Sequence, residues 1–184
     1  MNMNVDEREL LNSIKKDDVE YLQKSFESKD ITKFSFSIDL KIYDPVLQDQ
    51  PPIISVAAFF GAVKCLNYLI ECGLSLLSLD NKSRSIQYFS VAGGNIQVIK
   101  ILSSSGLEFS EYTHLAAGLG KLSLLQFLIN DLNCDPTTTD ALGSILLHNV
   151  AIGGDVKTAD WLIKSNFIDI NSRDLQGIPL FEFK

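Results

Sequence analysis

Glycines recur along this chain at intervals that constrain its architecture more than any other feature. Gly61 and Gly94 are separated by one period of about 33 residues, which is typical of proteins built from stacked copies of one small unit. Gly73 follows the first of these anchors at the same spacing as Gly106 follows the second. Gly120 and Gly154 continue the series, the former after a shortened interval and the latter after nearly a full period.

The residues that follow each of these anchor glycines repeat the same chemistry. The second residue after each glycine is aliphatic, the seventh is large and apolar, and the eighth is always leucine: Leu69, Leu102, Leu128 and Leu162. Apolar residues at the fourth, fifth, seventh and eighth positions share one face of an α-helix, so an amphipathic helix is predicted after each glycine. Small residues before each glycine, such as Val56-Ala57-Ala58, predict a second, shorter helix. Asp17 begins a weaker copy of the pattern.

One segment resembles the signature of a known family. Residues 140–154, DALGSILLHNVAIGG, resemble the ankyrin signature Asp-x-x-Gly-x-Thr-Pro-Leu-His-x-Ala-Ala-x-x-Gly. Ile145, Leu146 and Val150 depart from that signature, and the residues that match it are Asp140, Gly143, Leu147, His148, Ala151 and Gly154. The resemblance extends over about residues 52–177. The long first insertion and the AAFFG segment also resemble the divergent ankyrin proteins of some protists. The resemblance to the ankyrin family implies that the chain functions as an adaptor or scaffold.

The resemblance and the repeats together predict an all-α fold, an ankyrin-repeat solenoid of about five stacked helix-turn-helix units with short hairpin tips. Each unit buries its apolar face by stacking on its neighbours. We expect a single ankyrin-repeat domain over residues 1–184, with tips near 80–84 and 140–144. Its parts are an N-terminal helix pair at 6–28, an insertion at 29–51, repeats at 52–80, 85–106, 110–135 and 140–170, and the start of an incomplete repeat at 171–184.

Three places break the repeat. In the insertion, Phe34, Phe36 and the apolar residues up to Ile42 alternate with polar residues, which predicts an extended strand with one buried face. This segment is either a lid over the first helix pair or a partner-binding arm. The short interval before Gly120 predicts a missing tip, with Ser110 as the N-cap of the next helix. At the C-terminus, either the native protein continues or the last residues fold back over the edge.

Composition narrows the class of partner and the compartment. The net charge of −7 repels phosphate backbones and anionic headgroups, which disfavours nucleic acid and membrane surfaces as partners. Three cysteines, Cys65, Cys72 and Cys134, are too few and odd in number for a secreted disulfide framework. No signal peptide or membrane-length apolar run is present in the sequence. We therefore expect an intracellular protein, cytoplasmic or nuclear.

No residue pattern predicts catalysis, a cofactor, a metal ion or a small-molecule substrate. His114 and His148 occupy the histidine position of the ankyrin signature, and the resemblance implies that they hydrogen-bond to backbone in the turns. The anchors Gly61, Gly94, Gly120 and Gly154 are turn glycines and do not form a phosphate loop. The chain is therefore predicted to be a non-enzyme.

The remaining function is recognition of a protein partner by a monomeric chain. The alternative is a purely structural segment of a longer array, and the remote alternative is an enzyme without a recognisable motif. In a solenoid the first helices and the tips form the binding face. Aromatic and Arg side chains are common anchors of interfaces, so Phe59, Phe60 and Arg84 are the preferred patch. Phe60 or Phe89 could instead fill space between units. The full set of candidates is Phe59, Phe60, Asn81, Lys82, Arg84, Tyr88, Phe89, Leu119, Leu142 and Ser144.

Overall fold

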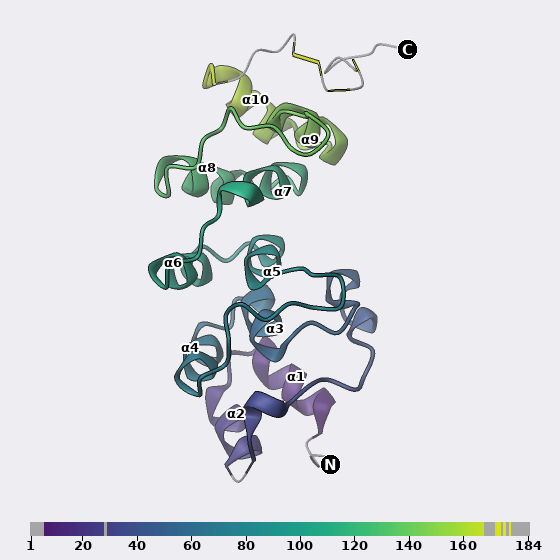
Figure 1. The fold of residues 1–184 in the computed structure, drawn as a ribbon, viewed down its shortest axis with the longest axis vertical. Helices are drawn as coiled ribbons and strands as arrows, with labels where there is room; N and C mark the ends of the chain where they lie inside the picture. The colour runs from purple at the N-terminus through teal and green to yellow at the C-terminus, as the bar shows by residue number, and fades with distance from the viewer. Residues whose placement is uncertain (1–5, 28, 168–171, 174, 176, 178–184) are drawn as a thin grey trace. The chain divides into compact units, whose positions relative to one another are not determined.

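The computed structural model describes residues 6–27, 29–167, 172, 173, 175 and 177 (Figure 1). Over these residues the chain is all-helical, with no β-strand. Ten α-helices follow one another in five pairs: α1 Glu7–Lys15 and α2 Val19–Phe26, α3 Ile53–Phe60 and α4 Val63–Glu71, α5 Ile86–Gly93 and α6 Ile96–Ser104, α7 Thr113–Gly118 and α8 Leu122–Asn130, α9 Leu146–Gly153 and α10 Val156–Lys164. The five predicted helix pairs are therefore confirmed.

Contacts within the chain group it into two compact units, Met1–Ser104 and Ser105–Lys184. The first unit holds the pairs α1/α2, α3/α4 and α5/α6, and the second holds α7/α8 and α9/α10. The boundary falls within the shortened glycine interval between Gly94 and Gly120, where a tip was predicted to be missing. The single domain expected from the sequence stays a prediction.

A left-handed residue makes the turn inside each helix pair. Gly61, Gly94, Gly120 and Gly154 have φ angles of 71°, 85°, 64° and 73°, a conformation that side chains with a Cβ rarely adopt. In the first pair Asp17 takes this place, with a φ of 55°. Aspartate tolerates this region better than most residues, because its short polar side chain can bond to nearby backbone.

The Asp17 side chain also caps the helix of another repeat. Its two carboxylate oxygens accept hydrogen bonds from the backbone N–H groups of Lys64 (3.1 Å) and Cys65 (2.9 Å) at the start of α4. No side chain at α4's own N-cap position does this. This cap joins the first two helix pairs, because Asp17 precedes Lys64 by 47 positions and Cys65 by 48 positions in the chain.

The leucine column of the sequence forms the centre of the core. Leu69, Leu102, Leu128 and Leu162 are all fully buried. Each lies on the apolar face of the second helix of its pair, as the periodicity predicts. First helices meet through small residues: a Cβ added to Gly93 would collide with the backbone carbonyl of Phe59, and one added to Gly153 with that of Gly118.

The insertion at 29–51 contains no strand, so that prediction is wrong. It holds three 3₁₀ helices, η1 Ile31–Lys33, η2 Leu40–Ile42 and η3 Pro45–Leu47. The predicted alternation of burial exists from Phe34 to Leu40, but Ile42 is 69% exposed. The segment 34–37 is backbone without regular structure and has no partner strand among the described residues, and Asp side chains begin each 3₁₀ turn.

The predicted N-cap at Ser110 is also wrong. Ser110 begins the 3₁₀ helix η4 Ser110–Tyr112, which leads into α7, and its backbone carbonyl accepts a hydrogen bond from the Thr113 hydroxyl (3.0 Å). The side chain of Ser110 does not cap α7, because the 3₁₀ turn lies between it and that helix. Most of the incomplete repeat expected at 171–184 lies outside the described residues.

Candidate interaction surface

Two tips with one hydrogen-bond pattern project before the first helices α5 and α9. In the first, the Asp80 N–H donates to the Arg84 carbonyl (3.1 Å). The Asp80 carboxylate accepts from the N–H groups of Lys82 (2.9 Å) and Arg84 (2.7 Å). Asp140 makes the same three bonds to Ser144 and Leu142 in the second unit, at 2.8 to 3.0 Å. The tips predicted at 80–84 and 140–144 are confirmed, and a carboxylate holds each in shape.

Each tip is linked by one backbone hydrogen bond to a neighbouring segment of its own unit. The Asn81 N–H donates to the Asp49 carbonyl (3.0 Å), and the Leu175 N–H donates to the Leu142 carbonyl (3.1 Å). In each case the carbonyl of the earlier residue accepts from the N–H of the later one. Asp49 is therefore the counterpart of Leu142, the acceptor residue of the second tip. The end of the insertion thus acts as the tip of the repeat at 52–80.

Arg84 is a clamp inside the first tip and not an exposed anchor. Its guanidinium donates to the Asp80 carboxylate (2.6 Å) and to the Gln48 carbonyl (2.8 Å), and it lies 3.5 Å from the Asp49 carboxylate. Its side chain is only 16% exposed. Burial acts to lower the pKa of Arg84, but hydrogen bonds to Asp80 and Tyr88 outweigh it and leave the pKa above its usual value.

The aromatic candidates divide into packed and accessible side chains. Phe89 is fully buried, so it fills space inside the unit and cannot contact a partner. Tyr88 is half-buried beside it, and the Arg84 guanidinium lies 5.0 Å from the centre of both rings. Phe59 and Phe60 are half-buried and meet edge to face at 5.1 Å.

Phe60 is partly used within the unit. The Lys15 ammonium lies 5.0 Å from the centre of the Phe60 ring and 4.7 Å from that of Tyr43 in the insertion. A cation over two aromatic rings joins α1, α3 and the insertion. Phe59 is therefore the more available member of the pair.

The preferred patch of Phe59, Phe60 and Arg84 is not assembled as the sequence suggested. Phe59 and Phe60 end α3, and the end of α5 at Gly93 packs against Phe59. Arg84 precedes the start of α5, so the length of that helix, about 12 Å, separates it from the phenylalanines. The correction follows from helix geometry, which places Arg84 and Gly93 at opposite ends of the same helix.

In the second unit the candidates also differ in accessibility. Leu119 is 46% exposed and Leu142 is 59% exposed. Ser144 is buried, and its backbone is engaged by Asp140 and by His114. Ser144 is therefore a structural residue of the tip, because its role there is to close the turn.

Both histidines contact backbone atoms. His114 Nε2 lies 3.1 Å from the Ser144 carbonyl, and His148 Nδ1 accepts a hydrogen bond from the Ile145 N–H (3.3 Å). Burial lowers the pKa of His114, although the nearby Asp140 carboxylate acts in the opposite direction. The neutral ring is thus favoured at the position where it touches the tip.

The described residues offer little for other chemistry. Among them, no three His, Cys, Asp or Glu side chains are grouped so that they could hold a metal ion. The cysteines are free thiols, with Cys65 and Cys134 buried and Cys72 half-buried. Within the same part of the chain, no helix has the length and apolar character needed to cross a membrane.

The fold and the tips define a class of protein, a repeat of helix pairs in which a polar tip precedes the first helix. A comparison with family models agrees: residues 113–163 match the model described as ankyrin repeats (many copies). The predicted ankyrin resemblance is thus confirmed over residues 113–163, and the predicted all-α helix-turn-helix fold class is confirmed over the described residues. No curated protein matches the chain. Ankyrin repeats generally mediate protein–protein interaction and are typically not enzymes.

Several residues that shape this surface were missed by the sequence analysis. Gln48 and Asp49 in the insertion hold Arg84, and Lys15 and Tyr43 cover Phe60. Asp80 was not missed, because it lies in the tip predicted at 80–84 and matches Asp140 and Asp174 in the tip column. The missed residues had no signal, since their partners lie far away in the chain or in a segment without a repeat.

Proposed function

We propose that the chain is a non-enzymatic adaptor that binds a protein partner through the tip and first helices of its first unit. The contact residues are Phe59, Asn81, Lys82 and Tyr88. The observation that supports this proposal is the tip itself, which is held by the buried Asp80 carboxylate and the Arg84 clamp while Asn81 and Lys82 remain exposed. The chain works by rigid display, as a monomer in the cytoplasm or nucleus.

Rigidity supports this role because a preformed surface loses less entropy on binding. The Arg84 side chain bonds to Asp80 on its own tip and to Gln48 of the insertion, so the tip is fixed on two sides. Asn81 adds a hydrogen bond from its amide to Gln50 (3.2 Å). Polar side chains on a fixed turn, next to the half-buried Tyr88 ring, resemble the aromatic and polar mixture of protein interfaces.

The charges on the tip and on the whole chain indicate what kind of partner surface fits the tip. Lys82 is 59% exposed and lies 3.3 Å from the Asp49 carboxylate, so the tip presents a paired cation and anion and not a basic patch. The net charge of −7 opposes phosphate backbones. A protein surface with both hydrogen-bonding and apolar groups fits this tip, whereas nucleic acid, a membrane and a small-molecule substrate do not.

The test is affinity capture from a lysate of the source cells with the parent chain and two matched variants. The surface variant carries Phe59→Ala, Lys82→Glu and Tyr88→Ala. The control variant carries Lys64→Glu and Asn67→Ala on the exposed side of α4, with the same change of charge. Circular dichroism and melting must match for all three. A protein retained by the parent and the control but lost with the surface variant supports the proposal, and equal retention by all three refutes it.

A second candidate is a structural role as one segment of a longer array of repeats. Leu175 bonds to the tip at Leu142 as Asn81 bonds to Asp49, and the end of α9 and the start of α10 expose Ile152 (87%) and Val156 (78%). At the position that matches Val156 in the preceding pair, Leu122 is half-buried, so Val156 is unusually open. Under this candidate, Ile152→Lys with Val156→Lys weakens association with an added ankyrin repeat and leaves the melting temperature unchanged.

A further inference from the structure

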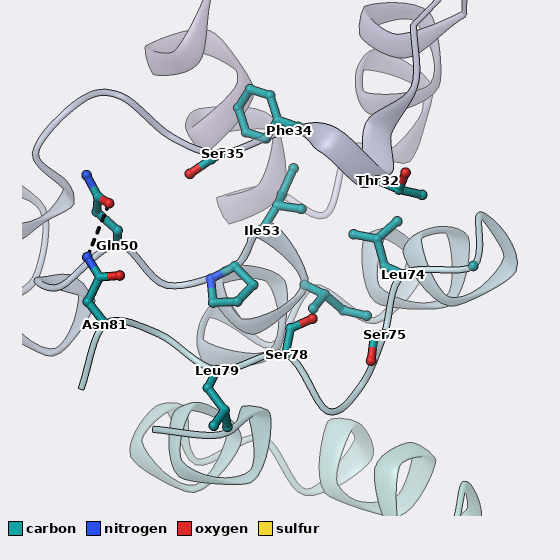
Figure 2. Close-up of a pocket in the computed structure, with 13 residues that line it drawn as sticks. Thr32, Phe34, Ser35, Gln50, Ile53, Leu74, Ser75, Ser78, Leu79 and Asn81 are labelled. Atoms are coloured by element: carbon teal, nitrogen blue, oxygen red, sulfur yellow. Dashed lines mark hydrogen bonds between the residues drawn. The ribbon is translucent and has the colours of Figure 1, made fainter. Parts of the chain in front are cut away.

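A groove of about 480 Å³ lies in the first unit, away from the proposed contact residues of α3 and α5 (Figure 2). One wall is the insertion at Thr32, Phe34 and Ser35, and the other is the loop that follows α4 at Ser75, Ser78 and Leu79. Ile53 at the start of α3 lies between the two walls. The volume is in the range of pockets that hold a small ligand or a few residues of peptide.

The insertion wall is anchored at both ends. The Glu7 carboxylate accepts hydrogen bonds from the N–H groups of Ser37 and Ile38 (2.8 Å each) and from the Ser37 hydroxyl (2.6 Å). At the other end, the amide of Asn81 bonds to Gln50, and this pair closes one side of the groove in Figure 2. The insertion wall of the groove is therefore held by hydrogen bonds at both ends.

Ser35 lies in this wall, and its backbone has no hydrogen-bond partner among the described residues. The segment around it alternates in burial, with Phe36 buried and Ser35 exposed, although it pairs with no strand among the described residues. In that same part of the chain, nothing bonds to the N–H or the carbonyl of Ser35, whereas the Ser37 N–H two positions later is taken by Glu7. A residue with both backbone groups free on an extended segment can pair with an added strand.

The side chains of the groove are neutral. They comprise the hydroxyl-bearing Thr32, Ser35, Ser75 and Ser78, the amides of Gln50 and Asn81, and the apolar Phe34, Pro52, Ile53, Ile54, Leu74 and Leu79. Of the residues that the structure describes, no Asp, Glu, Lys, Arg or His lines it. Because a charged ligand would lose hydration here without gaining a partner, the lining favours an uncharged ligand that can donate and accept hydrogen bonds.

We infer that this groove binds a short, extended peptide segment with uncharged side chains, which adds as a strand to the backbone of Ser35. The peptide backbone exchanges two hydrogen bonds with the N–H and carbonyl of Ser35, and its side chains meet the hydroxyls and Ile53. The site shares Asn81 with the proposed adaptor surface, where the Asn81–Gln50 pair forms the edge of the groove, but neither proposal depends on the other.

The test begins with selection of random heptapeptides from a phage-displayed library on the intact chain, followed by fluorescence anisotropy with the synthetic peptides selected. The key variant is Ser35→Pro, which removes the backbone donor. The backbone of Phe34, with φ −77° and ψ 136°, suits a following proline. Ser35→Ala is the matched control because it keeps the N–H and removes only the hydroxyl.

We expect uncharged peptides to be selected, to bind the parent and Ser35→Ala about equally, and to lose about tenfold in affinity with Ser35→Pro, since one hydrogen bond is worth about that factor. Ser75→Trp, at an exposed wall position, should block binding without affecting folding. N-methylation of the one peptide amide that pairs with Ser35 should have the same effect as the proline.

The proposal is overturned if no peptide is selected, if the selected peptides are charged, or if a folded Ser35→Pro variant and the Ser75→Trp variant bind them as the parent does. The surface variant of the adaptor test should bind these peptides normally. Failure at the groove and failure at the tip are therefore distinguishable.

Discussion

The close approach of first helices makes a sharp prediction for Gly93→Ala. An added Cβ at Gly93 would overlap the Phe59 carbonyl oxygen and lie 2.8 Å from its carbonyl carbon and 3.0 Å from its Cα. Ordinary contact begins at 3.4 Å, so the carbon atoms alone require a shift of 3.4 − 2.8 = 0.6 Å, and the oxygen requires more. All the opposing atoms are backbone, so no side-chain rotation relieves the collision.

The expected cost follows from overpacking, which destabilises proteins by about 1–3 kcal/mol, with the upper end appropriate for a backbone collision. Alanine regains up to about 1 kcal/mol through its higher helix propensity. The net loss is therefore about 2 kcal/mol, which for a chain of 184 residues lowers the melting temperature by about 4–8 °C.

Denaturant unfolding followed by circular dichroism measures this loss, with Gly118→Ala as the control. Gly118 also ends a first helix, but its added Cβ would lie 3.6 Å from the nearest atom, the Asn149 carbonyl oxygen, in ordinary contact. Gly118→Ala should therefore be neutral or slightly stabilising. If Gly93→Ala unfolds at the same denaturant concentration as Gly118→Ala, the packing of α5 on α3 is not as the structure has it.

Three further predictions concern buried polar and titratable groups. The Ser55 hydroxyl is fully buried with no hydrogen-bond partner among the described residues. Ser55→Ala should therefore leave the unfolding free energy unchanged or raise it by up to about 1 kcal/mol, and a clear loss of that free energy in denaturant unfolding would show that the hydroxyl has a partner. Maleimide should modify Cys72 first in the native chain, because burial raises the pKa of Cys65 to about 12; mass spectrometry that finds Cys65 modified first contradicts this. The lowered pKa of His114 means that the unfolded chain binds more protons just below pH 6.5, so stability should fall as pH drops through that range. His114→Gln should flatten this dependence in unfolding measurements, and an unchanged slope would assign it to another group.

The helix pairs could be predicted from the sequence because their pattern is local. The eighth residue after each anchor, such as Leu102 after Gly94, is a buried leucine in all four pairs that have a glycine anchor, and the anchors adopt the left-handed turns that glycine permits. Helical periodicity and a positive φ are properties of a few consecutive residues. A single sequence with a repeat therefore determines the fold class, the number of pairs and the tips at Asp80 and Asp140.

The surface was less predictable because exposure depends on distant partners. Phe89 looks like an anchor by its position in a first helix, yet it is fully buried, while Arg84 is held by Gln48, which is 36 positions earlier in the chain. The alternating insertion looks like a strand, but the described residues provide no partner strand, so its extended backbone is fixed by Glu7 instead.

The sequence by itself thus determined the repeating unit of this protein, because a period of about 33 residues and helix amphipathicity are written in neighbouring side chains. Only the tertiary structure decided which candidates face outward, what the Arg84 guanidinium binds, and that Ser35 borders a groove with free backbone groups. Those outcomes arise where residues far apart in the chain compete for the same buried volume and the same hydrogen bonds, and no local pattern records the result.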